Sequence, residues 1–319
     1  MKRPLVWLGS LFALSLLYAC DDNAAAGTRI AVIPKGTSHV FWSSIEAGAR
    51  RAGEELGVEI IWKGPAAEGD RESQIKIVEQ FVTEGVSGIV LTPLDDEALL
   101  RPVRLAASQK IPVVIADSDL NGELGKDFIS FVATDNVEGG RIAGRALVDL
   151  LGGSGKVVLL RYNVGSASTE NREKGFLEVL GEHPGIEVLV DNQYAGATPE
   201  DAIRKSGDML DTLQRADGIF CSNESATHGM LITLQKNGLA GKVKFVGFDN
   251  SPALVQGLRD GEIDALVVQN PRRMGYESVK AVVAHIRGEE VSQTIDTGVQ
   301  LVTRENMDQA EIAELIKSD

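Results

Sequence analysis

The chain has few of the residue types that build disulfide, metal or catalytic sites. Its 319 residues include two cysteines and four histidines, and the histidines are too scattered to predict a zinc site. A nucleophile elbow of the G-x-S-x-G type is lacking. Segment 152–156 is rich in glycine but lacks the spacing of a phosphate-binding loop and precedes a predicted strand, so we expect a turn there. The sequence therefore predicts a protein that is not an enzyme and that needs no metal or other cofactor.

Positive charge is also in short supply. Lysine and arginine together number 32 against 46 aspartates and glutamates, which gives a formal net charge of −14. Loss of residues 1–19, which contain Lys2 and Arg3, would change this charge from −14 to −16. A nucleic-acid backbone must be met by clustered lysine and arginine, and the sequence has no basic stripe. The composition therefore excludes nucleic acid as a partner.

The apolar run near the N-terminus is too short for a permanent transmembrane helix. It covers residues 5–18, about 14 residues, whereas a helix needs about 20 to cross a bilayer. Lys2 and Arg3 precede the run, and a small residue followed by Cys20 ends it. This order predicts a cleavable signal peptide over residues 1–19.

The residues around the predicted cleavage point resemble a membrane-anchoring motif. Leu-x-Ala-Cys, residues 17–20, resembles the lipobox of bacterial lipoproteins, which implies that Cys20 is lipidated and becomes the new N-terminus. Residues 20–28 would then form a polar tether. Asp21 resembles the inner-membrane retention signal of some Gram-negative lipoproteins. Ordinary secretion without a lipid is the alternative.

The rest of the chain alternates short apolar segments with longer segments of helical periodicity, which is the βαβ pattern. Most apolar segments are continuous, as in a parallel sheet that is buried on both faces. Helices are predicted over 73–84 and 169–180, where apolar residues recur on one face. The sequence thus predicts an α/β fold. Strands are predicted over residues 30–34, 59–62, 88–91, 112–116, 157–160, 186–190, 218–221, 244–248 and 265–268.

Polar side chains follow most of the predicted strands. In open α/β sheets, ligands bind outside the carboxyl ends of the strands, so these side chains are expected to converge on one site. A single Asp, Asn or Ser at such a position is equally well explained by helix capping or a turn, but their repetition favours a ligand site. They are residues 35–39, Thr92, Asp117, Ser118, Asn223, Asp249, Asn250, Gln269 and Asn270.

Short motifs along residues 28–303 carry a family resemblance. They are Phe41-Trp42, Gly48-Ala49, Ile111-Pro112-Val113, Thr134-Asp135-Asn136-x-x-Gly139-Gly140-x-x-Ala143-Gly144, Arg172-x-x-Gly175-Phe176, Asn223-Glu224, Val246-Gly247-Phe248-Asp249 and Gln269-Asn270-Pro271. With these motifs the chain resembles type I periplasmic solute-binding proteins of the ribose- and galactose-binding group. The resemblance implies two similar lobes, each a mostly parallel sheet flanked by helices, that are joined by a three-segment hinge and close on a sugar.

The resemblance also implies where the chain divides and that the protein is a monomer. Crossovers between the lobes are expected near residues 134–136, 269–271 and 297–300. The implied lobes are residues 29–134 with 270–298, and residues 135–269 with 299–319.

Carried over residue by residue, the resemblance implies a ligand site with contributions from both lobes. Ionised Asp accepts hydrogen bonds from sugar hydroxyls and Arg donates in a planar fork, and such charge-assisted bonds are strong. An aromatic face suits the apolar C–H side of a sugar ring, although core packing is the alternative explanation for the two aromatics. The implied contacts are His39, Phe41, Trp42, Thr92, Asp117 and Ser118 in one lobe, and Arg172, Asn223, Asp249 and Gln269 in the other.

Three positions depart from the pattern of ribose binders. Ser118 stands where they have Arg, His39 replaces an Asn, and Gly and Ala at 196–197 stand where an aromatic residue belongs. Tyr194 is close enough in sequence to supply that ring. These departures leave the ligand open among other aldoses, deoxy sugars and cyclic polyols.

The charges of the implied site bear on the ligand class. Asp117 and Asp249 oppose a single Arg172, with His39 taken as neutral at pH 7. An anionic ligand would enter a site that is already negative, so an uncharged ligand is predicted. A cationic amine, held by the carboxylates and the aromatic pair, is the alternative.

The resemblance implies that the protein captures a neutral monosaccharide or cyclic polyol and delivers it to the permease of an ABC-type sugar importer. The alternative among binding proteins is one that presents its ligand to a membrane sensor kinase or chemoreceptor. Transcriptional regulators share the two-lobed core, but they carry a basic DNA-binding headpiece where this chain has a predicted signal peptide. The expected location is the periplasm or the outer face of the cytoplasmic membrane, with Cys20 as the only attachment to that membrane.

Overall fold

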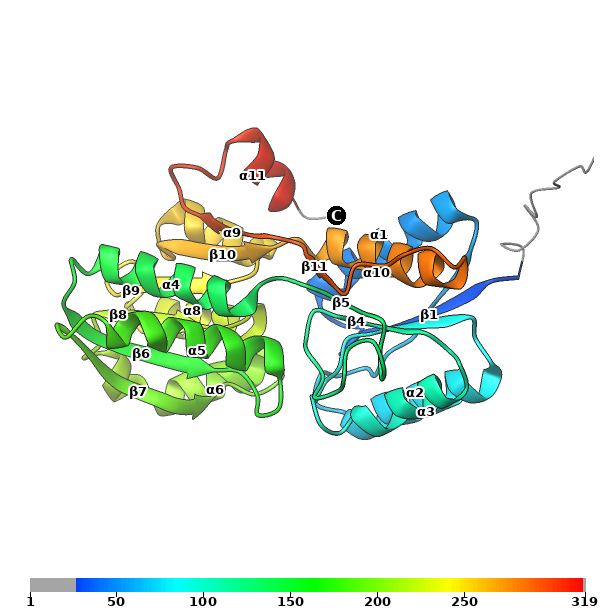
Figure 1. Cartoon of the computed structure of the whole chain (residues 1–319). Helices are drawn as coiled ribbons and strands as arrows, with labels where there is room; N and C mark the ends of the chain where they lie inside the picture. Colours follow the sequence, from blue (N-terminus) through cyan, green and yellow to red (C-terminus); the bar gives the residue numbers. More distant parts are fainter. Residues whose placement is uncertain (1–26, 318–319) are drawn as a thin grey trace, which may run out of the picture.

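The computed structural model describes residues 27–317 and consists of two α/β lobes that lie side by side (Figure 1). The predicted signal peptide, Cys20 and the tether up to residue 26 lie outside the described residues. Each lobe has a six-stranded sheet between two layers of helices, which confirms the predicted fold class. Within residues 27–317, no helix combines the length and the apolar character needed to cross a membrane.

The first lobe is built on a sheet in which all neighbouring strands are parallel. In order across the sheet, the strands are β11 (Thr294–Asp296), β5 (Ser130–Ala133), β4 (Val113–Ala116), β3 (Gly88–Leu91), β1 (Arg29–Ile33) and β2 (Glu59–Trp62). Helices α2 (Arg71–Glu84) and α3 (Leu100–Ser108) pack on one face, and α1 (Val40–Leu56) and α10 (Pro271–Ile286) pack on the other. Because both faces are covered, β3 and β4 are buried at every position, which explains their continuous apolar sequence.

The second lobe repeats this arrangement. In order across its sheet, the strands are β12 (Val299–Val302), β10 (Ala265–Gln269), β9 (Lys244–Phe248), β8 (Gly218–Cys221), β6 (Gly155–Arg161) and β7 (Ile186–Tyr194). Only β12 is antiparallel to its neighbour among these described strands. Helices α4 (Asn136–Leu150) and α5 (Ala167–Gly181) cover one face. The other face carries α6 (Pro199–Asp208), α7 (Leu210–Leu213), α8 (Glu224–Lys236), α9 (Pro252–Asp260) and α11 (Ala310–Leu315).

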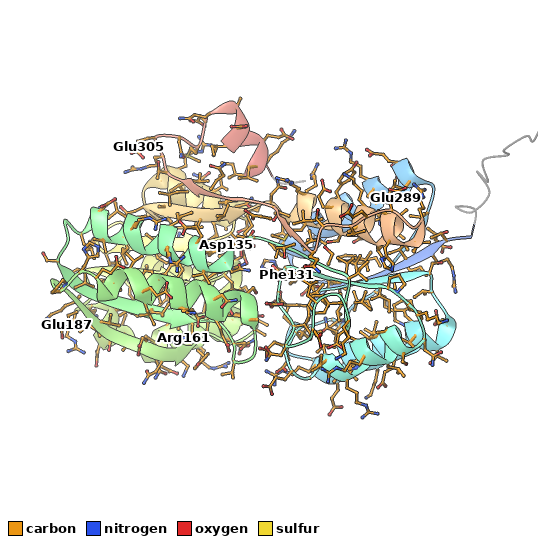
Figure 2. All side chains as sticks on the ribbon, in the orientation of Figure 1. Phe131, Asp135, Arg161, Glu187, Glu289 and Glu305 are labelled. Carbon is orange, nitrogen blue, oxygen red and sulfur yellow. The ribbon has the colours of Figure 1, made fainter. Side chains whose placement is uncertain are left out.

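The chain passes between the lobes three times. β5 leads into α4, β10 into α10, and β11 into β12, and each pair has one member in each lobe. Figure 2 shows Phe131 and Asp135 on the two sides of the first passage. The residue bounds implied for the lobes stay a prediction.

The sequence pattern did not predict β5, β11 or β12. β11 and β12 are short edge strands whose residues are mostly half-buried or exposed, so they lack the continuous apolar run that marks the central strands. β5 has only three apolar residues after Ser130. The expected turn at 152–156 is confirmed up to Gly155, where β6 begins earlier than predicted.

Two glycines bring α4 and α5 into close contact. A Cβ added at Gly140 would lie 1.9 Å from the backbone oxygen of Arg172, and one added at Gly175 would lie 2.0 Å from the backbone oxygen of Val137. Any side chain at either position would therefore push the helices apart. This contact fixes the first half of α5, and with it Arg172, against the helix that starts at the first crossover.

Candidate functional site

A cavity lies between the two lobes and brings together most of the predicted ligand contacts. It contains about 340 Å³ of atom-free space, with its open mouth included. The predicted residues that line it are His39, Phe41, Trp42, Asp117, Arg172, Asn223, Asp249 and Gln269. Lys35, which also lines it, was in the strand-end set but not among the implied ligand contacts. The residues in neither set are Glu68, Tyr162, Ser166, Ser168, Thr169 and Glu224.

Asp117 and Asp249 occupy matching positions in the two lobes. Asp117 directly follows β4 with a φ of 60°, and Asp249 directly follows β9 with a φ of 66°. This left-handed region is uncommon for residues other than glycine, and Asp is among those that adopt it most readily. Burial raises the pKa of Asp249, although Arg172 and a hydrogen bond of 2.6 Å from Gln269 Nε2 oppose the rise. Each lobe thus supplies one buried aspartate at a strand end to the cavity.

Arg172 is held in place by the second lobe and by the crossover. Its Nε donates to Asn136 Oδ1 at 2.8 Å, and its Nη1 donates to the backbone oxygen of Ser222 at 3.0 Å. The guanidinium carbon lies 3.9 Å from the centre of the Phe248 ring, in a cation–π contact. Nη1 also lies 3.8 Å from Asp249 Oδ2. With 2% of its surface exposed, Arg172 is a fixed cation in the wall of the cavity.

Lys35 is the partner of Asp117. Its Nζ lies 3.4 Å from Asp117 Oδ2 and donates to the hydroxyls of Ser166 and Ser168, both at 3.2 Å. The serines belong to the start of α5 in the second lobe, whereas Lys35 and Asp117 belong to the first. A single buried ammonium group therefore neutralises a carboxylate and connects the lobes.

His39 and Glu224 form an ion pair from opposite lobes. His39 caps α1, where its Nδ1 accepts from the Phe41 N–H at 3.1 Å, and its Nε2 contacts the Glu224 carboxylate. Burial lowers the pKa of His39, but the hydrogen bond and charge of Glu224 outweigh it and raise that pKa to about 8. The cap, which needs an unprotonated Nδ1, opposes this rise. Glu224 is a partner that the sequence did not reveal. It favours the protonated ring, whereas the cap favours the neutral ring assumed from the sequence, in which Nε2–H donates to Glu224.

Glu68 connects the aromatic wall of the first lobe to the second lobe. Trp42 Nε1 donates to Glu68 Oε1 at 2.8 Å, and the Tyr162 hydroxyl donates to Oε2 at 2.7 Å. Phe41 packs edge-to-face on Trp42, with 4.9 Å between the ring centres. Trp42 is 3% exposed, so it is part of the core of the lobe and part of the cavity wall at once.

Three of the implied ligand contacts do not line this cavity, and neither do Asn250 and Asn270 of the strand-end set. The Thr92 hydroxyl donates to the backbone oxygen of Ile33 at 3.0 Å, and Ser118 Oγ accepts from the Ser168 N–H at 3.1 Å. Both side chains are buried and fix the backbone around the cavity. Tyr194 is the last residue of β7, which continues beyond the predicted end at 190, and it lines a separate outer cavity.

Sequence reasoning could have found some of the residues that it missed. Tyr162 directly follows β6, and Glu224 directly follows Asn223. The strand-end argument, which had already included Lys35, applies to both of them. Glu68 lies in the irregular segment between β2 and α2, where no pattern marks it.

Two lobes that enclose a polar and partly aromatic cavity, with the chain passing between them three times, define a two-lobed binding protein. Residues 30–290 match the periplasmic binding protein domain family, and the chain belongs to that family.

Known relatives cover nearly the whole chain. The ribose import binding protein RbsB of Salmonella typhimurium is 27% identical over 293 residues, which cover 92% of this chain and 96% of the relative. A carbohydrate transporter solute binding protein from Agrobacterium radiobacter, solved with D-arabinose, is 36% identical with a TM-score of 0.87 and covers 92% of this chain and 99% of its own. An ABC transporter solute binding protein from Agrobacterium vitis, solved with D-fucose, is 33% identical with a TM-score of 0.87 and covers 91% of this chain and 100% of its own.

Proposed function

We propose that this protein captures a neutral monosaccharide or cyclic polyol in the cavity between its lobes and delivers it to an ABC-type sugar importer. The relatives support the transport part of this proposal, because they are a ribose import protein and solute binding proteins solved with D-arabinose and D-fucose. The lining residues support the ligand class, because carboxylates, amides, hydroxyls and an aromatic pair are the groups that bind sugar hydroxyls and ring faces.

The observation that carries the neutral ligand is the pairing of charges in the cavity. Asp117 lies beside Lys35, Asp249 beside Arg172, and Glu224 beside His39. A fourth carboxylate, Glu68, accepts two hydrogen bonds from aromatic side chains. A cationic amine would have to compete with these cations for the carboxylates, whereas sugar hydroxyls can add hydrogen bonds without separating the charges.

The proposed function is tested by a thermal-shift screen. We expect D-arabinose, D-fucose, D-ribose or myo-inositol to raise Tm clearly, because a ligand at 100 times its Kd adds about 2.7 kcal/mol to the stability of the native state. The bound sugar should be recovered chemically unchanged. Putrescine serves as the cationic comparison. A shift with putrescine but with none of the neutral compounds would contradict the proposal, and conversion of the sugar would point to an enzyme.

We propose further that the protein acts as a monomer outside the cytoplasmic membrane, held there through lipid on Cys20. Membership of the periplasmic binding protein family supports an extracytoplasmic location. The lipobox-like residues 17–20 and the polar tether support the anchor, which would keep the two lobes near a permease.

The anchor predicts a specific labelling result. Metabolic labelling with a fatty acid should mark the wild-type chain, and Cys20→Ala should remove the label because no thiol remains at the lipobox. Cys221→Ala is the matched control, since Cys221 is fully buried at the end of β8 and should not affect labelling. Equal labelling of the wild type and Cys20→Ala would show that the anchor is elsewhere or absent.

A further inference from the structure

A second cavity lies beside the first, and the two share Glu68 and Tyr162. The outer cavity contains about 840 Å³ of atom-free space, again with its open mouth included. One of its walls comes from the segment around Arg71 in the first lobe. The opposite wall comes from Asn163 and Tyr194 in the second lobe. The outer cavity is thus formed between the lobes, as the inner one is.

The two residues that line both cavities are joined by a hydrogen bond. The Tyr162 hydroxyl donates to Glu68 Oε2 at 2.7 Å, while Glu68 Oε1 accepts from Trp42 Nε1 on the inner side. The position of Glu68 depends on a glycine, because a Cβ at Gly36 would lie 2.8 Å from Glu68 Cγ. The carboxylate is therefore fixed at the boundary, within reach of ligand groups on both sides.

The outer walls carry the groups that bind sugars. Tyr194 is 38% exposed and offers an aromatic ring, and Asn163 offers an amide. Arg71 donates from Nη2 to the backbone oxygen of Val164 at 2.7 Å, which leaves further guanidinium donors on the same side chain. Its Nε also lies 3.0 Å from Asp95 Oδ2, so the charge of Arg71 is paired within the first lobe while its remaining N–H groups can donate to a ligand. The outer cavity is therefore not purely apolar. One wall combines the Tyr194 ring with the Asn163 amide, and the other combines the alkyl part of Arg71 with its guanidinium group.

We propose that the outer cavity is a second carbohydrate subsite and that the protein binds a disaccharide in addition to a monosaccharide. This inference rests on the proposed function, since the terminal sugar occupies the inner cavity. The second ring lies against Tyr194, with its hydroxyls facing Asn163 and Arg71. The linkage between the rings passes the boundary, where a ligand hydroxyl replaces Tyr162 as a donor to Glu68.

The test compares matched pairs of sugars by calorimetry on the full mature chain. The pairs are D-galactose with lactose and melibiose, D-glucose with maltose and cellobiose, and D-xylose with xylobiose. At least one disaccharide should bind as tightly as its monosaccharide or more tightly. Tyr194→Ala should weaken that disaccharide about tenfold, as expected for the loss of one well-packed aromatic contact, and should leave the monosaccharide unchanged. Leu105→Ala, at a side chain that is 40% exposed on α3, is the control.

The outcomes separate the two proposals. A monosaccharide that binds while none of its disaccharides does would overturn the second subsite and leave the proposed function standing. Failure of every sugar in both this panel and the thermal-shift screen would overturn both. One contrary result is a disaccharide that binds with a Kd that Tyr194→Ala raises no more than Leu105→Ala does, and another is an equal rise in the Kd of the monosaccharide with Tyr194→Ala. Either result would mean that the second ring is not in the outer cavity. Asn163→Ala provides a second variant on the same wall in case Tyr194→Ala does not fold.

Discussion

Replacing Arg172 with alanine should lower the free energy of unfolding by about 3–5 kcal/mol, the cost of leaving one member of a buried ion pair alone. Arg172 lies 3.8 Å from Asp249 and also donates to Asn136 Oδ1 and the Ser222 backbone oxygen. Truncation removes all three contacts and leaves a buried carboxylate with no cation beside it. Denaturant unfolding at pH 7, compared with the wild type, measures the loss.

The control is Arg141→Ala on the neighbouring helix α4. Arg141 is 41% exposed and pairs with Glu178 on the surface at 2.7 Å, so its loss should cost less than about 1 kcal/mol. Adding Asp249→Asn to Arg172→Ala should restore part of the stability, because the unpaired charge is then absent. If Arg172→Ala lowers the free energy of unfolding no more than Arg141→Ala does, the pairing of Arg172 with Asp249 does not stabilise the fold.

The stability loss caused by Arg172→Ala should also depend on pH. Burial raises the pKa of Asp249 in the folded protein, and removal of Arg172 removes a group that opposes this rise. A carboxyl whose pKa is higher in the folded state than in the unfolded state binds its proton more readily when folded. The penalty of Arg172→Ala is therefore fully present above the folded pKa of Asp249 and shrinks as the pH falls through it.

The central part of the fold was predictable because burial leaves a direct mark on the sequence. The predicted strands 59–62, 88–91, 218–221 and 244–248 coincide with β2, β3, β8 and β9. Except for β2 at one sheet edge, these strands lie inside a sheet with both faces covered, so their residues are apolar in succession. The edge strands β11 and β12 are partly exposed, and nothing in their local composition distinguishes them from loops.

The site residues that directly follow a strand could be predicted from the sequence. The contacts that form where the two lobes meet could not. Asp117 and Asp249 directly follow buried strands, so the rule for open sheets places them in the cavity. The contact between His39 and Glu224 depends on how the lobes close, and separation in sequence does not reveal it. Tyr194 was assigned to the inner site because it is close in sequence to 196–197, where the resemblance expects an aromatic residue. In the structure it ends β7 and lines the outer cavity.

The cavity also shows why the sequence-based charge count was incomplete. It considered Asp117, Asp249 and Arg172 and found an excess of negative charge. Lys35 adds positive charge that the count did not include, and Glu68 and Glu224 add negative charge. The conclusion in favour of a neutral ligand now depends on local pairing, because a carboxylate with a cation beside it attracts a further cation less than a sum of formal charges suggests.

Replacing Asp117 with asparagine should weaken binding of the most stabilising sugar at least about tenfold. A hydrogen bond to a charged group contributes about 1.5–3 kcal/mol, and 1.4 kcal/mol corresponds to one decade in Kd. Asparagine is the informative substitution, because it keeps the size of the side chain and tolerates the φ of 60° at this position. It removes the charge that accepts from the ligand and leaves Lys35 Nζ, which now lies 3.4 Å from Asp117 Oδ2, without its carboxylate.

Asp127→Asn is the matched control for this loss. Asp127 is 5% exposed and pairs with Arg104 at 3.1 Å in the same lobe, but it does not line the cavity. Both variants remove a buried carboxylate from an ion pair, so both should lower Tm, whereas only Asp117→Asn should raise the Kd measured by calorimetry. Equal affinity in the wild type and a folded Asp117→Asn would mean that Asp117 serves only to neutralise Lys35. An equal loss of affinity in both variants would mean that the effect comes from the stability of the lobe and not from contact with the sugar.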